Sequence, residues 1–157
     1  MTASCGEGGM TDDTILNVRT VVGAVAIREG TVLLLRRNVT DFMGGQWEIP
    51  SGVVEPNEDH LVALHREVLE ETGLRIARVI TRLGVFEYRS KSGRLTMQWN
   101  FLVELSSGTP ALADHDLFKW VSIDELVDSA LTDEVMTDVA RGFRWLSERD
   151  SDQDVQA

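Results

Sequence analysis

A cluster of three glutamates decides what chemistry this sequence could perform. Glu67, Glu70 and Glu71 stand at positions i, i+3 and i+4, so a helix would bring their carboxylates to one face. Carboxylates this close repel one another, and their hard oxygens are the ligands that Mg²⁺ and Mn²⁺ prefer. The simpler interpretation is an acidic face that contacts only solvent. That interpretation explains neither Arg66, next to Glu67, nor the glycine and the glutamate that precede the cluster.

The segment 59–72 has the pattern of a helix with clear ends. Asp59 is a suitable N-cap because its side chain can accept a hydrogen bond from a free backbone N–H. Gly73 suits the position after the helix, where glycine takes a left-handed backbone at little cost. Ala63 lies one turn before Glu67, and its small side chain would let a loop approach the carboxylates. Four residues share the side expected to face the core: Leu61, Leu64, Val68 and Thr72.

The complete pattern is Gly52-x5-Glu58-x7-Arg66-Glu67-Val68-x-Glu70-Glu71-x-Gly73-Leu74. It resembles the Nudix box, the signature of hydrolases that cleave a diphosphate joined to another moiety. The resemblance implies that Glu70 and Glu71 are metal ligands. It also implies that Glu67 is either a ligand or the catalytic base that activates water.

The same resemblance gives the surrounding residues supporting roles. Arg66 is implied to hold a box glutamate in place for catalysis, a task that suits the bidentate fork of a guanidinium. Glu58 is implied to lie near the metals or to pair with Arg66, and Gly52 and Gly73 are expected to support the box. The residue before the box glycine is implied to offer its backbone carbonyl to a metal. Here that residue is Ser51, where many relatives have glycine.

Candidates for substrate binding flank the box in the sequence. Arg36 and Arg37 end a predicted strand, where alternation should turn only one guanidinium toward substrate phosphates. Glu48 is a candidate contact to substrate or metal, and Trp47 belongs either to the core or to the substrate site. Tyr88 is a candidate for stacking on a nucleobase. Three further aromatic residues could stack or could equally belong to the core: Phe86, Trp99 and Trp120.

An acidic loop precedes the last predicted strand. The resemblance implies a loop carboxylate, about six residues before a tryptophan, that binds a further metal or acts as the general base. Asp114 fits this spacing to Trp120 best, and Asp116 is the next candidate. His115, between them, is interpreted as a surface residue, because Mg²⁺ prefers oxygen ligands.

Apolar patterns predict a β-rich chain around the box helix. Strands are expected at residues 18–28, 31–37, 46–49, 74–80, 83–90, 94–105 and 118–122. A capping box, Ser122-x-x-Glu125, predicts a short helix, and residues 133–148 predict a longer amphipathic one. The pattern alone favours an α/β or α+β fold. The resemblance implies the Nudix α/β/α sandwich, with a mixed central sheet and the box as a loop–helix–loop.

Length and composition limit the classes of function. The 157 residues are expected to form one domain at 14–149, with flexible tails at 1–13 and 150–157. The net charge of −11 argues against general nucleic-acid binding, and no apolar run approaches the roughly 20 residues that span a bilayer. No secretory signal pattern is visible and Cys5 is the only cysteine, so the sequence favours a reducing, cytoplasmic setting. Cys5 itself receives no role.

The resemblance to the Nudix box, together with the clustered carboxylates, implies Mg²⁺-dependent hydrolysis, with Mn²⁺ as a substitute, of a nucleoside diphosphate linked to another group. A nucleoside triphosphate, cleaved to monophosphate and pyrophosphate, is the first expectation, and ADP-ribose or another nucleotide sugar is the alternative. A regulatory Nudix domain that binds a nucleotide without cleaving it is an alternative of another class. An isopentenyl diphosphate isomerase would need cysteine machinery that a single cysteine does not offer. The expected partner is a small nucleotide-like molecule, and the expected state is a monomer or a homodimer.

Overall fold

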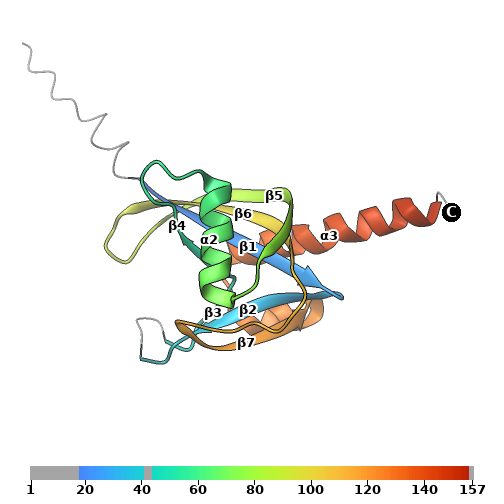
Figure 1. The fold of residues 1–157 in the computed structure, drawn as a ribbon, viewed down its shortest axis with the longest axis horizontal. Helices are drawn as coiled ribbons and strands as arrows, with labels where there is room; N and C mark the ends of the chain where they lie inside the picture. The colour runs from blue at the N-terminus through green and yellow to red at the C-terminus, as the bar shows by residue number, and fades with distance from the viewer. Residues whose placement is uncertain (1–17, 41–43, 156–157) are drawn as a thin grey trace, which may run out of the picture.

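The computed structural model describes residues 18–40 and 44–155, so Cys5 and the whole expected N-terminal tail, 1–13, lie outside the described residues. The described chain forms a mixed seven-stranded sheet, with helices on both faces (Figure 1). No helix in this part of the chain is both long and apolar enough to cross a membrane. The strands are β1 Arg19–Arg28, β2 Thr31–Arg37, β3 Trp47–Glu48, β4 Ser51–Val53, β5 Ile76–Arg89, β6 Leu95–Leu105 and β7 His115–Ser122. The helices are α2 His60–Thr72, the 3-10 helix η1 Ile123–Ser129 and α3 Asp133–Val155.

The sheet is mixed because β1 runs parallel to β6 and antiparallel to its other neighbours, β2 and β4. The main path is β3-β2-β1-β6-β5; β4 pairs with β1, and β7 pairs with β2. β4, which opens the box, is therefore hydrogen-bonded to the central strand. The box loop is held against the middle of the sheet, directly under the helix that carries the glutamates.

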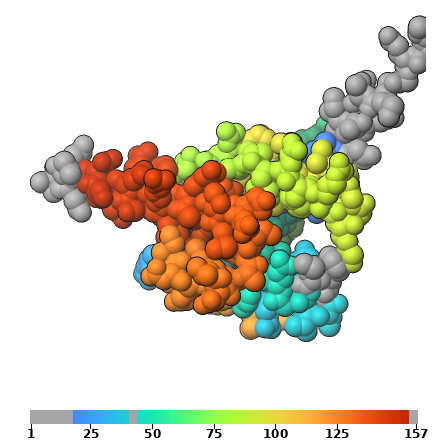
Figure 2. Space-filling view, turned by 180° about the vertical axis from the view of Figure 1, so that it is seen from behind, coloured from blue at the N-terminus to red at the C-terminus, as the bar shows by residue number. Residues whose placement is uncertain are grey.

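Alternate residues of the central strands fill two separate cores. Val22 and Leu33 face the core that lies under α2, and Val25 and Leu34 face the core that lies under α3. These side chains are fully buried, because a sheet covered on both faces has no exposed side. Seen from behind, α3 and the preceding 3-10 helix cover the second face (Figure 2). The predicted α/β/α sandwich with a mixed sheet is confirmed.

Several predicted boundaries are wrong. Residues 74–80 and 83–90 belong to one long strand, β5, whose register against β6 shifts at three places. β4 was not predicted, and β7 begins at His115 rather than at 118. The predicted capping box is also wrong, because the Ser122 side chain makes no cap hydrogen bond and the short helix is 3-10. Residues beyond 149, predicted as a flexible tail, continue α3 as far as Val155.

The ends of α2 are as predicted. The Asp59 side chain accepts a hydrogen bond from the backbone N–H of Leu61 at 2.8 Å, and Gly73 ends the helix in the left-handed region at φ 69°. The predicted core face is partly wrong: Leu61 is 43% exposed, whereas Ala63 is fully buried. The helix packs against β4 as well as β1, so the side that carries the glutamates is turned toward the box loop.

Two leucines of α2 provide a matched test of this packing. Leu64 is 1% exposed, and Leu64→Ala should lower the free energy of unfolding by about 2–5 kcal/mol because it leaves a cavity under the helix. Leu61→Ala makes the same chemical change at an exposed position and should cost about 1 kcal/mol or less. Urea unfolding measures both values, and equal losses would contradict the placement of α2.

Candidate active site

The guanidinium of Arg66 is the centre of the box. Its Nε and Nη2 donate to the two carboxylate oxygens of Glu58 at 2.9 and 2.8 Å. Its Nη1 donates to Glu67 at 2.8 Å and more weakly to Glu70 at 3.4 Å, and Nη2 also donates to the carbonyl of Val53 at 3.0 Å. Of the two roles weighed for Glu58, the geometry favours the Arg66 partner. One cation thus holds two helix carboxylates and the box loop together.

This arrangement changes the ionisation of the groups that it joins. The hydrogen bonds from Arg66, followed by one from the backbone N–H of Glu55, lower the pKa of Glu58 to about 2. The hydrogen bond to Glu58, and after it the one to Glu67, raise the pKa of Arg66, although burial opposes them. For Glu67 the larger effect is burial, which raises its pKa although Arg66 acts in the opposite direction. The pKa of Glu58 is therefore shifted downward and that of Glu67 upward, although both carboxylates bond to the same guanidinium.

Gly52 makes the close approach of the box loop possible. A Cβ placed on this glycine would overlap the carboxylate of Glu67. Ala63, one helical turn before Glu67, is fully buried and leaves room for the same approach. The loop backbone and the carboxylate can therefore lie in contact only while position 52 has no side chain.

Glu71 occupies a different environment from the other box glutamates. The backbone N–H of Ser51 donates to its carboxylate at 3.0 Å. Burial raises the pKa of Glu71 to about 8; the Ser51 hydrogen bond opposes this, and the nearby charges of Glu48 and Glu67 add to it. A buried carboxylate among other carboxylates is a group that a bound cation would stabilise in its charged form.

The carboxylates do not yet form a closed metal site. Among the described residues, no three His, Cys, Asp or Glu side chains converge closely enough to enclose a cation. Glu67 and Glu70 are turned toward Arg66, whereas Glu71 is turned toward Ser51. The hard oxygen donors fit a divalent cation, but some of these side chains must turn to bind one together.

A cleft of about 550 Å³ opens beside Glu71, and we call it the box cleft. Asp114 and Arg37 line it, whereas Arg36 and Asp116 do not. Arg36 instead forms a bidentate ion pair with Asp116, at 2.8 and 3.0 Å, which lowers the pKa of Asp116. Of the two arginines, which alternate along β2, only Arg37 lies at the cleft, and its contact with substrate phosphates stays a prediction. The lining residues are Arg19, Val21, Arg37, Glu48, Ser51, Gly52, Glu71, Tyr88, Gln98, Asp114 and His115.

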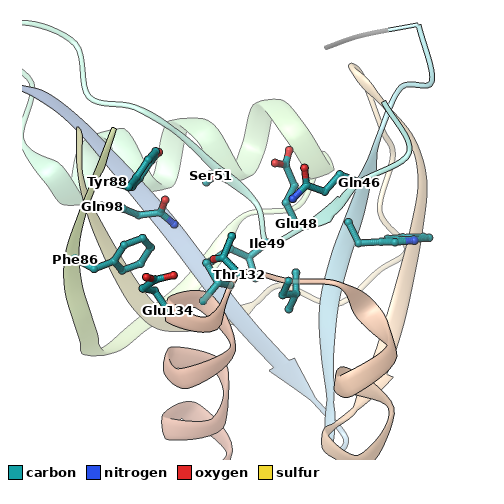
Figure 3. A pocket seen from close by; sticks show the side chains of 12 residues that line it. Gln46, Glu48, Ile49, Ser51, Phe86, Tyr88, Gln98, Thr132 and Glu134 are labelled. Carbon is teal, nitrogen blue, oxygen red and sulfur yellow. The ribbon is translucent and has the colours of Figure 1, made fainter. Parts of the chain in front are cut away.

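A second cavity, of about 250 Å³, adjoins the box cleft, and we call it the apolar pocket (Figure 3). The two share Glu48, Ser51, Tyr88 and Gln98, so a ligand could extend from one into the other. Its other lining residues are Gln46, Trp47, Ile49, Phe86, Leu131, Thr132, Glu134 and Val135. Sequence patterns pointed to the aromatic members, but not to Gln46, Gln98 or Glu134, which carry no local motif.

The remaining aromatic candidates lie elsewhere. Trp99 packs on the core and contacts His60, with ring centroids 4.9 Å apart. Trp120 also packs on the core and lies beneath the guanidinium of Arg28 at 4.8 Å. Neither tryptophan lines the box cleft or the apolar pocket.

The prediction that His115 is a surface residue is wrong. Its side chain is only 7% exposed, and its Nε2 lies 2.8 Å from a carboxylate oxygen of Glu48. Its Nδ1 is buried without a hydrogen-bond partner among the described residues. β7 begins at this residue and pairs it with Arg37 of β2, which draws the ring inward.

Comparison with known proteins agrees with this geometry. The sequence-family model of the NUDIX domain matches residues 17–146 of this chain. The chain belongs to the Nudix family. A Mycobacterium tuberculosis protein named as a candidate 8-oxo-dGTP diphosphatase is 35% identical over 114 residues, 73% of this chain and 79% of that protein. The CTP pyrophosphohydrolase of Escherichia coli is 32% identical over 111 residues, 71% of this chain and 81% of that enzyme.

Solved structures show the same relationship. The crystal structure of a MutT NUDIX hydrolase from Burkholderia pseudomallei superposes with a TM-score of 0.69 at 27% identity, covering 79% of this chain and 97% of that one. The protein is thus a Nudix hydrolase, of a family that acts on nucleotide-derived molecules and generally uses divalent metals. The roles assigned above to single side chains of this Nudix hydrolase remain predictions.

Gly52→Ala tests the contact between the box loop and Glu67. The added methyl group should displace the Glu67 carboxylate and lower kcat by roughly 100-fold, because small misplacements at a reacting centre have effects of this size. Gly30→Ala is the control: this turn glycine has φ 74° and open space around it, so it should lose about 1 kcal/mol of stability and keep its activity. Equal activity in both variants would contradict the role of Gly52.

The raised pKa of Glu71 predicts how stability depends on pH without metal. Its folded pKa of about 8 lies above the ordinary 4.5, so its contribution is complete below pH 4.5 and is lost as the pH rises through 8. In EDTA, the free energy of unfolding should fall by up to on the order of 1 kcal/mol per pH unit in that window. Glu71→Gln should show a smaller slope in urea unfolding at pH 5–8.5. Identical slopes would refute the burial of this carboxyl.

Proposed function

We propose that this Nudix hydrolase cleaves nucleoside triphosphates to a nucleoside monophosphate and pyrophosphate in the presence of Mg²⁺, with Mn²⁺ as a substitute. The observation that carries the proposal is the junction of two cavities. The carboxylate-lined box cleft meets an apolar pocket with aromatic walls, and four residues are common to both. A nucleotide could therefore place its phosphate chain in the box cleft and its flat base in the apolar pocket at the same time.

The residues present suit a divalent cation. Glu67, Glu70 and Glu71 offer carboxylate oxygens from one helix face, and Asp114 lines the box cleft together with Glu71. The carbonyl of Ser51 completes the expected ligand set. A bound cation would neutralise and polarise the bridging phosphates. Arg66 keeps Glu67 and Glu70 close to this position, because it bonds both of them and the loop.

The chain's other side chains have tasks that follow from their positions. Arg37 lies at the box cleft beside Glu48, where its guanidinium suits phosphate oxygens. Tyr88 and Trp47 line the apolar pocket, where aromatic faces suit a flat ring. A carboxylate must take the proton of the attacking water, and Glu67 and Asp114 are the two candidates. Burial raises the pKa of Glu67, which favours it as a proton acceptor.

The names of the relatives support a triphosphate. The Mycobacterium tuberculosis relative is named for 8-oxo-dGTP and the Escherichia coli relative for CTP, and both substrates are nucleoside triphosphates. Each of those proteins is matched over more than two thirds of its length. The two names disagree about the base, so they support the reaction more strongly than the identity of the base.

Product analysis tests the proposal directly. The purified protein with Mg²⁺ should convert at least one member of a triphosphate panel to monophosphate and pyrophosphate, separated by ion-exchange chromatography. Reaction in H₂¹⁸O should label only one product and so identify the phosphorus that is attacked. A sugar phosphate released from ADP-ribose, with triphosphates untouched, would move the enzyme to the nucleotide-sugar class. Binding without turnover would favour the regulatory alternative.

Substitution of single carboxylates tests the site. Glu70→Gln and Glu71→Gln should each lower kcat/KM by roughly 100-fold or more, since even the outer partners of metal ligands contribute 10- to 100-fold. Glu104→Gln is the matched control, because Glu104 lies on β6 in an exposed ion pair with Arg78, and it should keep full activity. Full activity in both box variants would disprove the assignment.

A further inference from the structure

A buried chain of polar side chains connects α3 to the apolar pocket. Asp138 of α3 is 2% exposed, Asn100 of β6 is fully buried, and Gln98 of β6 is 7% exposed. Asn100 Nδ2 donates to Asp138 Oδ2 at 2.9 Å, and Gln98 Nε2 donates to Asn100 Oδ1 at 2.9 Å. Arg141 Nη1 donates to the other carboxylate oxygen of Asp138, Oδ1, at 3.1 Å. Gln98 ends this network at the pocket, whose lining it joins.

Two glycines, on the two strands that flank β6, leave the space that the network fills. A Cβ on Gly23 of β1 would overlap the side-chain oxygen of Asn100, and a Cβ on Gly84 of β5 would overlap Asp138. Neither glycine has a positive φ, so backbone conformation does not explain them. The two glycines make room for the side chains of Asn100 and Asp138, so the sheet accommodates the polar network specifically.

The network fixes which end of each amide points in which direction. A carboxylate can only accept hydrogen bonds, so Asn100 must turn its NH₂ group toward Asp138. The Asn100 oxygen then faces Gln98, which must donate a hydrogen bond to it from its own NH₂ group. The Gln98 oxygen, Oε1, is left for the pocket, and no hydrogen bond to it is found within the described part of the chain. A free glutamine could flip to suit either kind of partner, but the bond from one N–H of this amide to Asn100 keeps its oxygen, the acceptor, on the side of the pocket.

A second residue of the pocket has the same character as the Gln98 oxygen. Glu134, at the start of α3, also lines it, and an ionised carboxylate has only acceptors to offer. Figure 3 shows the Gln98 amide between Tyr88 and Phe86, with Glu134 below them. A ring inserted between these side chains would meet acceptors at its edge. An exocyclic amino group placed against Gln98 Oε1 and Glu134 would donate to them, whereas a carbonyl oxygen in the same place would be repelled.

We infer that Asp138, acting through Asn100, is a positioning residue that locks Gln98 as a hydrogen-bond acceptor and so selects nucleobases with an exocyclic amino group. The inference rests on the proposed function and adds to it the chemistry of base selection. Asp138 itself touches no substrate. It acts by setting the direction of two hydrogen bonds, and the selected bases are cytosine, adenine and guanine rather than uracil or hypoxanthine.

The experiment reverses the direction of the network and then restores it. In Asp138→Asn, the new amide can keep its oxygen on Arg141 and donate to Asn100, which allows Asn100 and then Gln98 to flip. In the double variant Asn100→Asp with Asp138→Asn, the new carboxylate at 100 accepts from both neighbours, so Gln98 again presents its oxygen. Gln98→Met removes the amide at similar size. Asp150→Asn, at an exposed position of α3, is the matched control.

The readout is kcat/KM for pairs that differ in the amino group: CTP against UTP, and ATP or GTP against ITP. The wild type and the control should prefer the amino member by about tenfold or more, the effect of one hydrogen bond. Asp138→Asn and Gln98→Met should lose most of this preference, and the double variant should recover it to within about threefold. Thermal melts establish that each variant is folded at the assay temperature.

Other outcomes would overturn the inference. An unchanged preference in Asp138→Asn, or a double variant that folds but does not recover the preference, would reduce the network to a structural anchor of α3. The same pairs, offered as nucleoside monophosphates in titration calorimetry, need no cleavage. If the wild type hydrolyses no triphosphate, the proposed function fails, while calorimetry still decides whether the amino group is selected. Equal affinity for CMP and UMP, and for AMP, GMP and IMP, would refute base selection itself.

Discussion

Mutual repulsion among carboxylates on one helical turn is the constraint on which the rest of this structure depends. A helix with three glutamates in i, i+3 and i+4 positions is destabilised unless a positive charge lies among them. Arg66 supplies that charge, and its planar group also bonds Glu58 and the carbonyl of Val53. The acidic face is therefore tied to the loop before it. This tie in turn requires Gly52, because no larger residue fits against Glu67.

The two faces of the sheet carry different parts of the candidate active site. α2 brings the carboxylates to one side of the sheet, and α3 and its network shape the apolar pocket from the other side. β1 lies between them: β4 pairs with it at Gly23, the residue that also makes room for Asn100. A substrate that crosses from the box cleft to the apolar pocket therefore meets residues of both layers.

The sequence was sufficient for the local parts of this arrangement. The box was found through its resemblance to a family signature, and the caps of α2 and the alternation of Arg36 and Arg37 follow from spacing, since each of these depends on neighbours within a few residues. The continuity of β5 was missed because its register shifts interrupt the apolar pattern. The burial of His115 and the pairing of Asn100 with Asp138 were missed for a deeper reason. Both depend on contacts between segments that are far apart in the chain, and a single sequence does not indicate which distant segments will lie together.

The position of the polar network argues for a role in specificity rather than in stability. Buried charged and amide groups add little to folding, because desolvation offsets their hydrogen bonds, and well-packed apolar residues of similar size are often at least as stable. A fully bonded network does, however, fix a unique direction for every hydrogen bond in it. The network formed by Asp138, Asn100 and Gln98 ends at the apolar pocket, which we propose as the site of the base, so its direction would be transmitted to a base bound there. Apolar packing could anchor α3 equally well, but it could not tell a donor from an acceptor at the edge of a base.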